Sequence, residues 1–266
     1  MRRSGFTLIE LLVVIAILTV LIAILVPALR AGRQQARAAA CGSNLRQLAQ
    51  ALTVYDLENG TFPYGFDDSA FGTVVPPGGY PGSAARDLLG WWWFHSLVDI
   101  RRENFDKGTI FWCPSRRVKD LYVLCGNYGV NRSVCRDAQE FTDSEFVRTP
   151  LGLYEIQQPA ETLLIADSGY SLISWRAASD ASGPYFDNPR REGAFYVPGL
   201  AINEKRLLEG TISPGFEQDA IEGRHPNKSV NVVFADGHLT RIKADELLVE
   251  EAGGSYTNRS PLWMPE

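Results

Sequence analysis

The sequence predicts an α+β protein in which one long N-terminal helix packs on an antiparallel sheet domain with long loops. Three observations predict this fold. Residues 11–29 are apolar and carry no charge, and a helix of roughly 20 apolar residues is long enough to cross a bilayer. Apolar residues at helical spacing follow this run, and alternating apolar residues near the C-terminus predict paired strands. The first half of the helix is therefore expected to span a membrane.

The second half of the helix is expected to leave the membrane at residue 30 and to end near residue 59. It carries one apolar stripe, formed by Leu45, Leu48, Leu52 and Tyr55. The stripe is too short for a sustained heptad repeat, so it predicts docking on the soluble domain rather than a free coiled coil. Gly42-Ser43-Asn44 predicts a loosening or bend, and Asn59-Gly60 predicts the helix end.

The middle of the chain is predicted to hold mainly loops. Residues 60–85 are rich in Gly, Pro and aromatic residues, whereas residues 86–100 predict a helix bearing Trp91-Trp92-Trp93-Phe94. Three adjacent tryptophans cannot all face one core, so either they seat the surrounding loops or they form an exposed contact surface. We favour packing. Residues 174–218 have no clean periodicity and predict long loops, with a strand near residues 193–197.

The strands are easier to place. Residues 163–166 predict a buried strand ending at Asp167, which is a turn acid or, less commonly, a metal ligand. Residues 230–235 alternate as a strand does, and Asp236-Gly237 predicts a hairpin with a type I′ turn, which needs positive φ at both central residues. Residues 238–242 form its partner strand. Residues 245–251 predict a short helix closed by Gly253-Gly254.

An enzymatic function is not favoured. His225, Asp236 and His238 could bind a metal or act as acid and base. However, Asp236-Gly237 is explained as a turn, and nothing in the sequence brings His225 to Asp236. No nucleophile with a paired base and no phosphate-binding glycine loop is evident. The sequence therefore predicts no catalytic residue, no cofactor and no metal ligand.

The N-terminal string Gly5-Phe6-Thr7-Leu8-Ile9-Glu10 needs an explanation beyond a membrane anchor. An unpaired carboxylate within a bilayer costs about 2.5–3.5 kcal/mol, so Glu10 is expected to have a function. The string and the apolar run resemble the class III signal of type IV prepilins and type II secretion pseudopilins. The resemblance implies that a prepilin peptidase cuts between Gly5 and Phe6 and methylates the new terminus. Glu10 would then compensate the terminal ammonium of a neighbouring subunit in an assembled filament.

The C-terminal half resembles a second, related family. His225 and the string Phe234-Ala235-Asp236-Gly237-His238 are similar to the end of large pilin-like proteins called DUF1559, or H-X9-DG, proteins. Ten residues separate His225 from Asp236 here, one more than that name specifies, so a role that depends on the position of His225 is in doubt. Asn44-Leu45-Arg46-Gln47-Leu48, Cys113, Asn127 and the strand after Pro159 also match family landmarks.

These resemblances imply a pilin-like organisation. Residues 1–5 are a leader, residues 6–29 a transmembrane segment, residues 30–59 the extracytoplasmic half of the helix, and residues 60–266 a soluble globular domain. The implied partners are prepilin peptidase, other pilin or pseudopilin subunits, the secretion or pilus assembly machinery and the bacterial inner membrane. Calcium binding occurs among pseudopilins, but no calcium-ligand spacing is evident here.

The charge and the cysteines bear on the partners of the domain and, in the extracytoplasmic location that the resemblance implies, on its disulfides. The chain of 266 residues carries a formal net charge of −5. Residues 1–50 contribute +5, leaving −10 on the rest, so no nucleic-acid partner is predicted. Four cysteines allow three complete pairings, and an oxidising location favours pairs among Cys113, Cys125 and Cys135. No CxxC spacing occurs, which makes a zinc site a weaker alternative.

Two functions of other classes remain as alternatives. A permanently anchored binding module would use the Trp91–Phe94 surface or the long loops, and would keep residues 1–5. An extracytoplasmic metal-dependent enzyme would use His225, Asp236 and His238. The favoured function is a non-enzymatic filament subunit.

Overall fold

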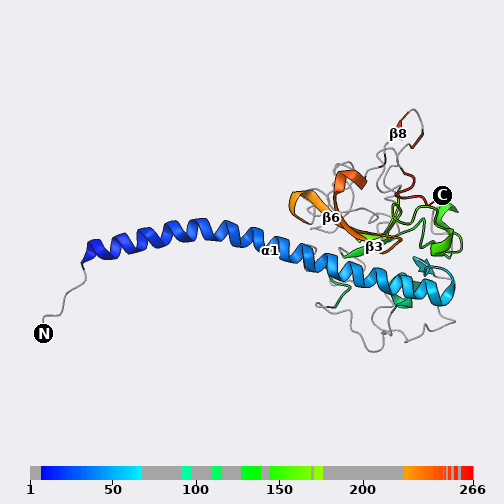
Figure 1. Ribbon diagram of the computed structural model, residues 1–266, viewed down its shortest axis with the longest axis horizontal. Coiled ribbons are helices and arrows are strands. Elements are labelled where there is room, and N and C mark those ends of the chain that lie inside the picture. Colours follow the sequence, from blue (N-terminus) through cyan, green and yellow to red (C-terminus); the bar gives the residue numbers. More distant parts are fainter. Residues whose placement is uncertain are drawn as a thin grey trace.

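The computed structural model describes residues 7–67, 91–97, 109–115, 127–138, 144–168, 171–175, 225–247, 249, 251–252, 255–256 and 259–265. Helix α1 (Leu8–Asn59) is 52 residues long. Its first half extends away from the rest of the molecule, and its second half lies along the sheet domain (Figure 1). The strands predicted at 163–166 and 230–235 are present, with the observed bounds 163–167 and 229–234, as is the predicted α+β architecture.

Both ends of α1 are capped by residues that favour a helix end. Thr7 caps the start, where its hydroxyl accepts from the Glu10 N–H and the Glu10 carboxylate accepts from the Thr7 N–H. At the other end Gly60 adopts a left-handed φ of 78°, a conformation that glycine reaches without a Cβ penalty. Pro27 lies inside the helix, in the half whose axis curves (Figure 1). The predicted break at Gly42-Ser43-Asn44 is wrong, because α1 is continuous there.

The central sheet has five strands in the order β5-β3-β4-β6-β7. They are β3 (Tyr128–Asn131), β4 (Leu163–Asp167), β5 (Leu172–Ile173), β6 (Ser229–Phe234) and β7 (Leu239–Lys243). Neighbours are antiparallel except β3 and β5, which pair in parallel. The expectation of an antiparallel sheet is therefore wrong at this edge. There β5 follows β4 in the chain but pairs with β3, and it runs in the same direction as β3.

Both faces of the sheet are covered, which explains why β3, β4 and β6 are buried along their whole length. Helix α1 lies on one face against β4, β6 and β7. A first core lies between them and includes Leu45, Leu48, Ile165 and Val233. A second core on the other face includes Val230, Val232 and Trp263. Adjacent residues of β6 thus point to different cores, as strand geometry requires.

The tryptophan-rich segment is not an α-helix in its described part. Trp91–Trp92 forms β2, paired antiparallel with β1 (Phe66–Asp67), and a 3-10 turn, η2 (Trp93–Ser96), follows. Three consecutive side chains of this segment, Trp92, Trp93 and Phe94, are all buried in the first core. The favoured packing role is confirmed for these three side chains. Residues 86–90 and 98–100 lie outside the described residues, as do residues 193–197 and most of 174–218.

The C-terminal hairpin forms with a different turn from the one predicted. The Gly237 N–H bonds the Phe234 carbonyl at 2.9 Å, the Phe234 N–H bonds the His238 carbonyl at 3.1 Å, and positive φ occurs at Gly237 but not Asp236. This is a three-residue loop with a left-handed glycine rather than a type I′ turn. The predicted helix at 245–251 is also wrong: η7 (Ala244–Leu247) is a 3-10 turn, and β8 (Glu251–Ala252) pairs antiparallel with β9 (Ser255–Tyr256).

The remaining described elements are three 3-10 turns, η3 (Ser144–Phe146), η4 (Leu153–Glu155) and η6 (Pro226–Lys228). The last of these leads directly into β6, and it includes Asn227 at a φ of 62°.

Candidate functional site

The first half of α1 presents apolar side chains on every side. Each Leu, Ile and Val between Leu8 and Leu29 is at least 40% exposed, whereas buried helix residues begin at Ala38. By length and composition this is a helix that could cross a membrane. A surface of this kind is stable only when lipid or other protein covers it. The first half of α1 is thus a site of insertion or assembly.

Glu10 lies at the start of this apolar half. Its Oε2 accepts hydrogen bonds from the backbone N–H and the hydroxyl of Thr7, both at 2.8 Å. A carboxylate near a helix N-terminus is also favoured by the helix dipole. Glu10 is exposed, so a group from another molecule can reach it. Gly5 and Phe6 lie outside the described residues.

The second half of α1 is fixed to the domain along the predicted stripe. Leu45, Leu48 and Leu52 are fully buried, and Tyr55 is half-buried. Gly42 allows close approach of the sheet, since a Cβ there would lie 3.1 Å from Leu239 Cδ2. Asp56 near the helix end accepts from the Leu153 N–H at 3.1 Å. The second half of α1 and the sheet domain are therefore expected to move together.

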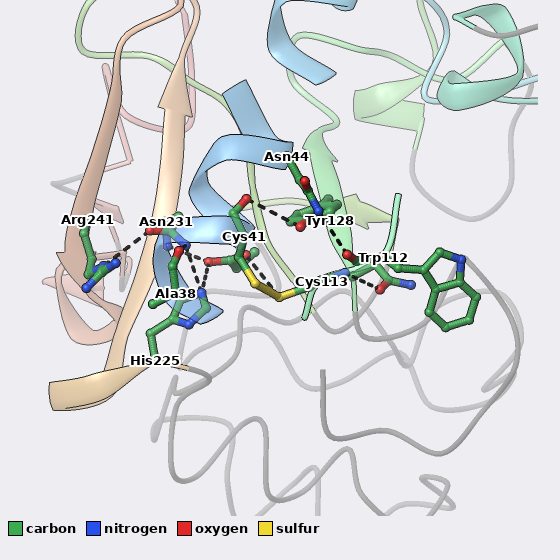
Figure 2. The surroundings of a disulfide bond; sticks show 11 residues. Ala38, Cys41, Asn44, Trp112, Cys113, Tyr128, His225, Asn231 and Arg241 are labelled. Carbon is green, nitrogen blue, oxygen red and sulfur yellow. Dashed lines mark hydrogen bonds and ion pairs between the residues drawn. A yellow bond between two sulfur atoms is a disulfide. The ribbon is translucent and has the colours of Figure 1, made fainter. Parts of the chain in front are cut away.

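A disulfide between Cys41 and Cys113 joins α1 to the 109–115 segment (Figure 2). This differs from the expected pairs among Cys113, Cys125 and Cys135: Cys41 was left out, and Cys135 is a buried free thiol. Burial, and secondarily the charge of Asp137, raise the pKa of that thiol. Cys125 lies outside the described residues. The pairing depends on which segment crosses the helix, which spacing does not reveal.

Hydrogen bonds hold both sides of the disulfide in place. The Cys113 N–H donates to Asn127 Oδ1 at 3.1 Å, and the Asn44 side chain donates to the Trp112 carbonyl at 3.1 Å. The Tyr128 hydroxyl donates to the Cys41 carbonyl at 3.4 Å. Asn127, one of the family landmarks, is thus a positioning residue for the loop that carries Cys113.

A buried polar cluster lies beside the disulfide. His225 Nε2 is 2.7 Å from Asp167 Oδ2, and the same oxygen accepts from the Asn231 N–H at 2.7 Å. His225 Nε2 also lies 2.9 Å from the side-chain nitrogen of Asn231. The Asn231 side chain donates to the Ala38 carbonyl of α1 at 3.2 Å, so the cluster also connects the sheet to the helix. Figure 2 shows His225 and Asn231 beside the turn of α1 that holds Ala38 and Cys41.

The structure does not assemble the histidines and Asp236 into one site. His225 precedes β6 and is buried, while Asp236 and His238 lie at the opposite end of that strand. His238 Nδ1 is 2.6 Å from Asp236 Oδ1 in an exposed pair, and the His238 ring stacks on Phe234. Gly237 supplies the turn. The metal-dependent enzyme alternative therefore lacks its proposed constellation.

Sequence reasoning missed Cys41 and Asn231, and it placed Asp167 in a turn. Asp167 is instead the last residue of β4 and is fully buried. One usable signal was present: Asn231 is a polar residue within an otherwise apolar strand, and such a residue must find hydrogen-bond partners when it is buried.

Comparison with known proteins gives two family matches, both within the first 104 residues. Residues 1–26 match the model for the prokaryotic N-terminal methylation motif. Residues 30–104 match the model for a protein of unknown function, DUF1559. The N-terminal part of the chain is therefore similar to prepilins. The motif includes most of the exposed half of α1, and the second match starts at residue 30, before Ala38, the first buried residue of the helix.

Curated relatives match a part of the chain. Type II secretion system core protein G of Pseudomonas aeruginosa is 39% identical over 62 residues, which are 23% of this chain and 44% of the relative. The protein of the same name from Aeromonas hydrophila is 40% identical over 62 residues, or 23% and 43% of the two chains. The match thus spans less than half the length of these relatives. No solved structure gives a significant match.

Proposed function

We propose that this protein is a non-enzymatic subunit of a type II secretion pseudopilus or a related type IV pilus-like filament. One observation carries the proposal. A methylation motif is joined to a helix half that is apolar all round and extends beyond its own domain (Figure 1). Such a half needs an apolar environment, which the inner membrane supplies before assembly and neighbouring helices supply after it.

Processing follows from the motif. The peptidase cuts between Gly5 and Phe6 and methylates Phe6, so the mature chain starts two residues before α1 begins at Leu8. Residues 1–5 are then lost as leader, residues 6–29 remain in the membrane, and residues 30–266 lie on its far side. The Cys41–Cys113 disulfide supports this orientation, since disulfides persist in oxidising compartments outside the cytoplasm.

Glu10 sets the register of the assembled helices. In a staggered stack its carboxylate meets the ammonium group of Phe6 on a neighbouring subunit, and each charge compensates the other in an apolar core. The Thr7 hydrogen bonds hold the carboxylate at the helix start. A subunit in the wrong register leaves two charges unpaired, which makes the correct stagger strongly preferred.

The anchored binding module has less support. Its aromatic contact surface included Trp92, Trp93 and Phe94, which are buried. A filament subunit, in contrast, uses the helix half that is exposed. The burial of these aromatic side chains is explained by packing, without a bound ligand.

The first experiment is the intact mass and N-terminal peptide map of the protein from its native membrane. The proposal expects a chain that starts at N-methylated Phe6. Gly5→Arg should leave residues 1–5 attached, because the peptidase site then has a bulky side chain next to the cut. An unprocessed wild-type chain in cells with active peptidase would overturn the proposal.

Glu10→Gln separates assembly from processing. The variant should be cut and methylated like the wild type, yet enter sheared filaments at a level reduced at least tenfold. Thr7→Val is the matched control, since it removes the hydroxyl contact to Glu10 and keeps the charge. Normal incorporation of Glu10→Gln would exclude the pairing with Phe6.

A further inference from the structure

We propose that Cys41, Cys113, Asp167 and His225 form a zinc site when the disulfide is reduced, so that zinc and the disulfide are alternative states of one buried centre. One ligand atom from each of these residues lies within 4.8 Å of the others. All four residues are buried. The group is distinct from the assembly surface of α1, and it goes beyond the proposed function.

The donor set suits zinc. Two thiolates, one imidazole nitrogen and one carboxylate oxygen are all common zinc ligands, and four such groups complete a tetrahedral structural site. Thiolates disfavour calcium and magnesium, which prefer oxygen. Donors also come from four separate segments, namely α1, the 109–115 segment, the end of β4 and the residue before η6. A metal bound here would join the same segments that the disulfide and its hydrogen bonds join.

The geometry leaves the ligands little distance to move. Cys113 Sγ is 4.0 Å from Asp167 Oδ1, while Oδ2 of the same carboxylate holds the Asn231 N–H and lies 2.7 Å from His225 Nε2. In a tetrahedral site with zinc–sulfur bonds of about 2.3 Å, two sulfur atoms stand roughly 3.8 Å apart. Rotation of the two cysteine side chains provides this separation once the bond is broken.

Supporting hydrogen bonds of the kind found around zinc ligands are already present. The Asn231 N–H orients the Asp167 carboxylate at 2.7 Å, and Asn127 holds the backbone of Cys113 at 3.1 Å. Contacts of this type orient ligands and raise metal affinity. His225 Nδ1 is buried and has no hydrogen-bond partner in the described part of the chain, which is unusual for a histidine with a purely structural role.

The chemistry balances with one named reductant. A water-soluble phosphine takes up the oxygen of one water to become the phosphine oxide, and the disulfide becomes two thiols. Binding of Zn²⁺ then displaces one proton from each thiol. Zinc affinity should therefore rise with pH by on the order of a hundredfold per unit while both thiols are protonated in the free form.

The test uses the full chain in detergent, treated with the phosphine or left oxidised. The reduced chain should bind one Zn²⁺, at least a hundredfold more tightly than the oxidised chain. Co²⁺ in place of zinc should give the absorption of a tetrahedral thiolate complex. Cys113→Ser should abolish that absorption, and His225→Ala and Asp167→Asn should each weaken binding at least tenfold.

Matched controls separate this site from loose binding by thiols. Cys135→Ser removes a described cysteine that is not a member of the group, and His238→Ala removes the exposed histidine; both should bind as the wild type does. Equal binding by Cys113→Ser, or full affinity in both His225→Ala and Asp167→Asn, would overturn the proposal. If reduction unfolds the chain, zinc must restore its near-UV circular dichroism; failure to do so overturns the proposal as well.

Discussion

The two halves of α1 share one helical backbone but have opposite surroundings. From Leu8 to Leu29 the apolar side chains are exposed on every side, whereas beyond Ala38 a stripe that includes Leu45, Leu48 and Leu52 is buried on the sheet domain. The first half therefore depends on a partner outside its own chain, and the second half depends on its own domain. Because α1 is one continuous helix, the position of its exposed first half fixes the position of the domain on its second half.

The largest expected effect on folding stability comes from removing the disulfide that joins the second half of α1 to the domain. Cys41→Ser opens a loop with a sequence separation of 72 residues, and the loop-entropy model assigns about 4 kcal/mol of folding stability to such a link. Urea unfolding, followed by tryptophan fluorescence in detergent, measures the loss. Reduction should lower the wild-type midpoint to that of the variant and leave the variant unchanged. Equal midpoints for both oxidised proteins would mean that the second half does not need the link.

A matched pair of substitutions compares the two halves directly. Leu48→Ala removes a fully buried side chain and should lower the free energy of unfolding by about 2–5 kcal/mol. Leu18→Ala, at a residue that is 50% exposed, should leave the unfolding of the domain unchanged. Both free energies come from the same urea titration. Similar losses for the two variants would show that the halves are not independent.

Two glycines sharpen the comparison. Gly42→Leu places a side chain against Leu239 and Asn231, and overpacking of this kind costs about 1–3 kcal/mol. Gly32→Leu has open space around its Cβ and should stabilise the helix by up to about 1 kcal/mol, because leucine has the higher helix propensity. Hydrogen exchange of the α1 amides would report both effects. Faster exchange in Gly32→Leu would contradict the assignment of an open helix face.

The last effect is a pH dependence confined to the domain. Burial lowers the pKa of His95 to about 3, while an unfolded histidine titrates near 6.5. Between these values the unfolded chain binds the extra proton, so stability falls as the pH falls from 6.5 toward 3, by at most about 1.4 kcal/mol per unit. Acid should thus unfold the domain while the first half of α1 stays helical in detergent. An unchanged slope in His95→Gln would remove this explanation.

Prediction from sequence succeeded where a local pattern decides the outcome. Asn59-Gly60 ends the helix because glycine reaches the left-handed cap, and the stripe that includes Leu48 docks because its spacing matches one helix face. It failed at Gly42, where a residue of weak helix propensity is held in the helix by contact with the sheet. It failed again for the segment 91–97, where Trp91–Trp92 pairs with Phe66–Asp67 and a 3-10 turn follows instead of an α-helix.

The sequence by itself determined the apolar helix, its N-terminal motif, the strand and hairpin near the C-terminus and the α+β class, since each depends on residues close together in the chain. Only the tertiary structure decided that Cys41 pairs with Cys113, that β5 is parallel to β3, and that Asp167, His225 and Asn231 meet under α1. These contacts join residues 58 to 193 positions apart or depend on strand order. Distance along the chain carries no information about which buried polar groups will find one another, and packing of the helix on the sheet supplies it.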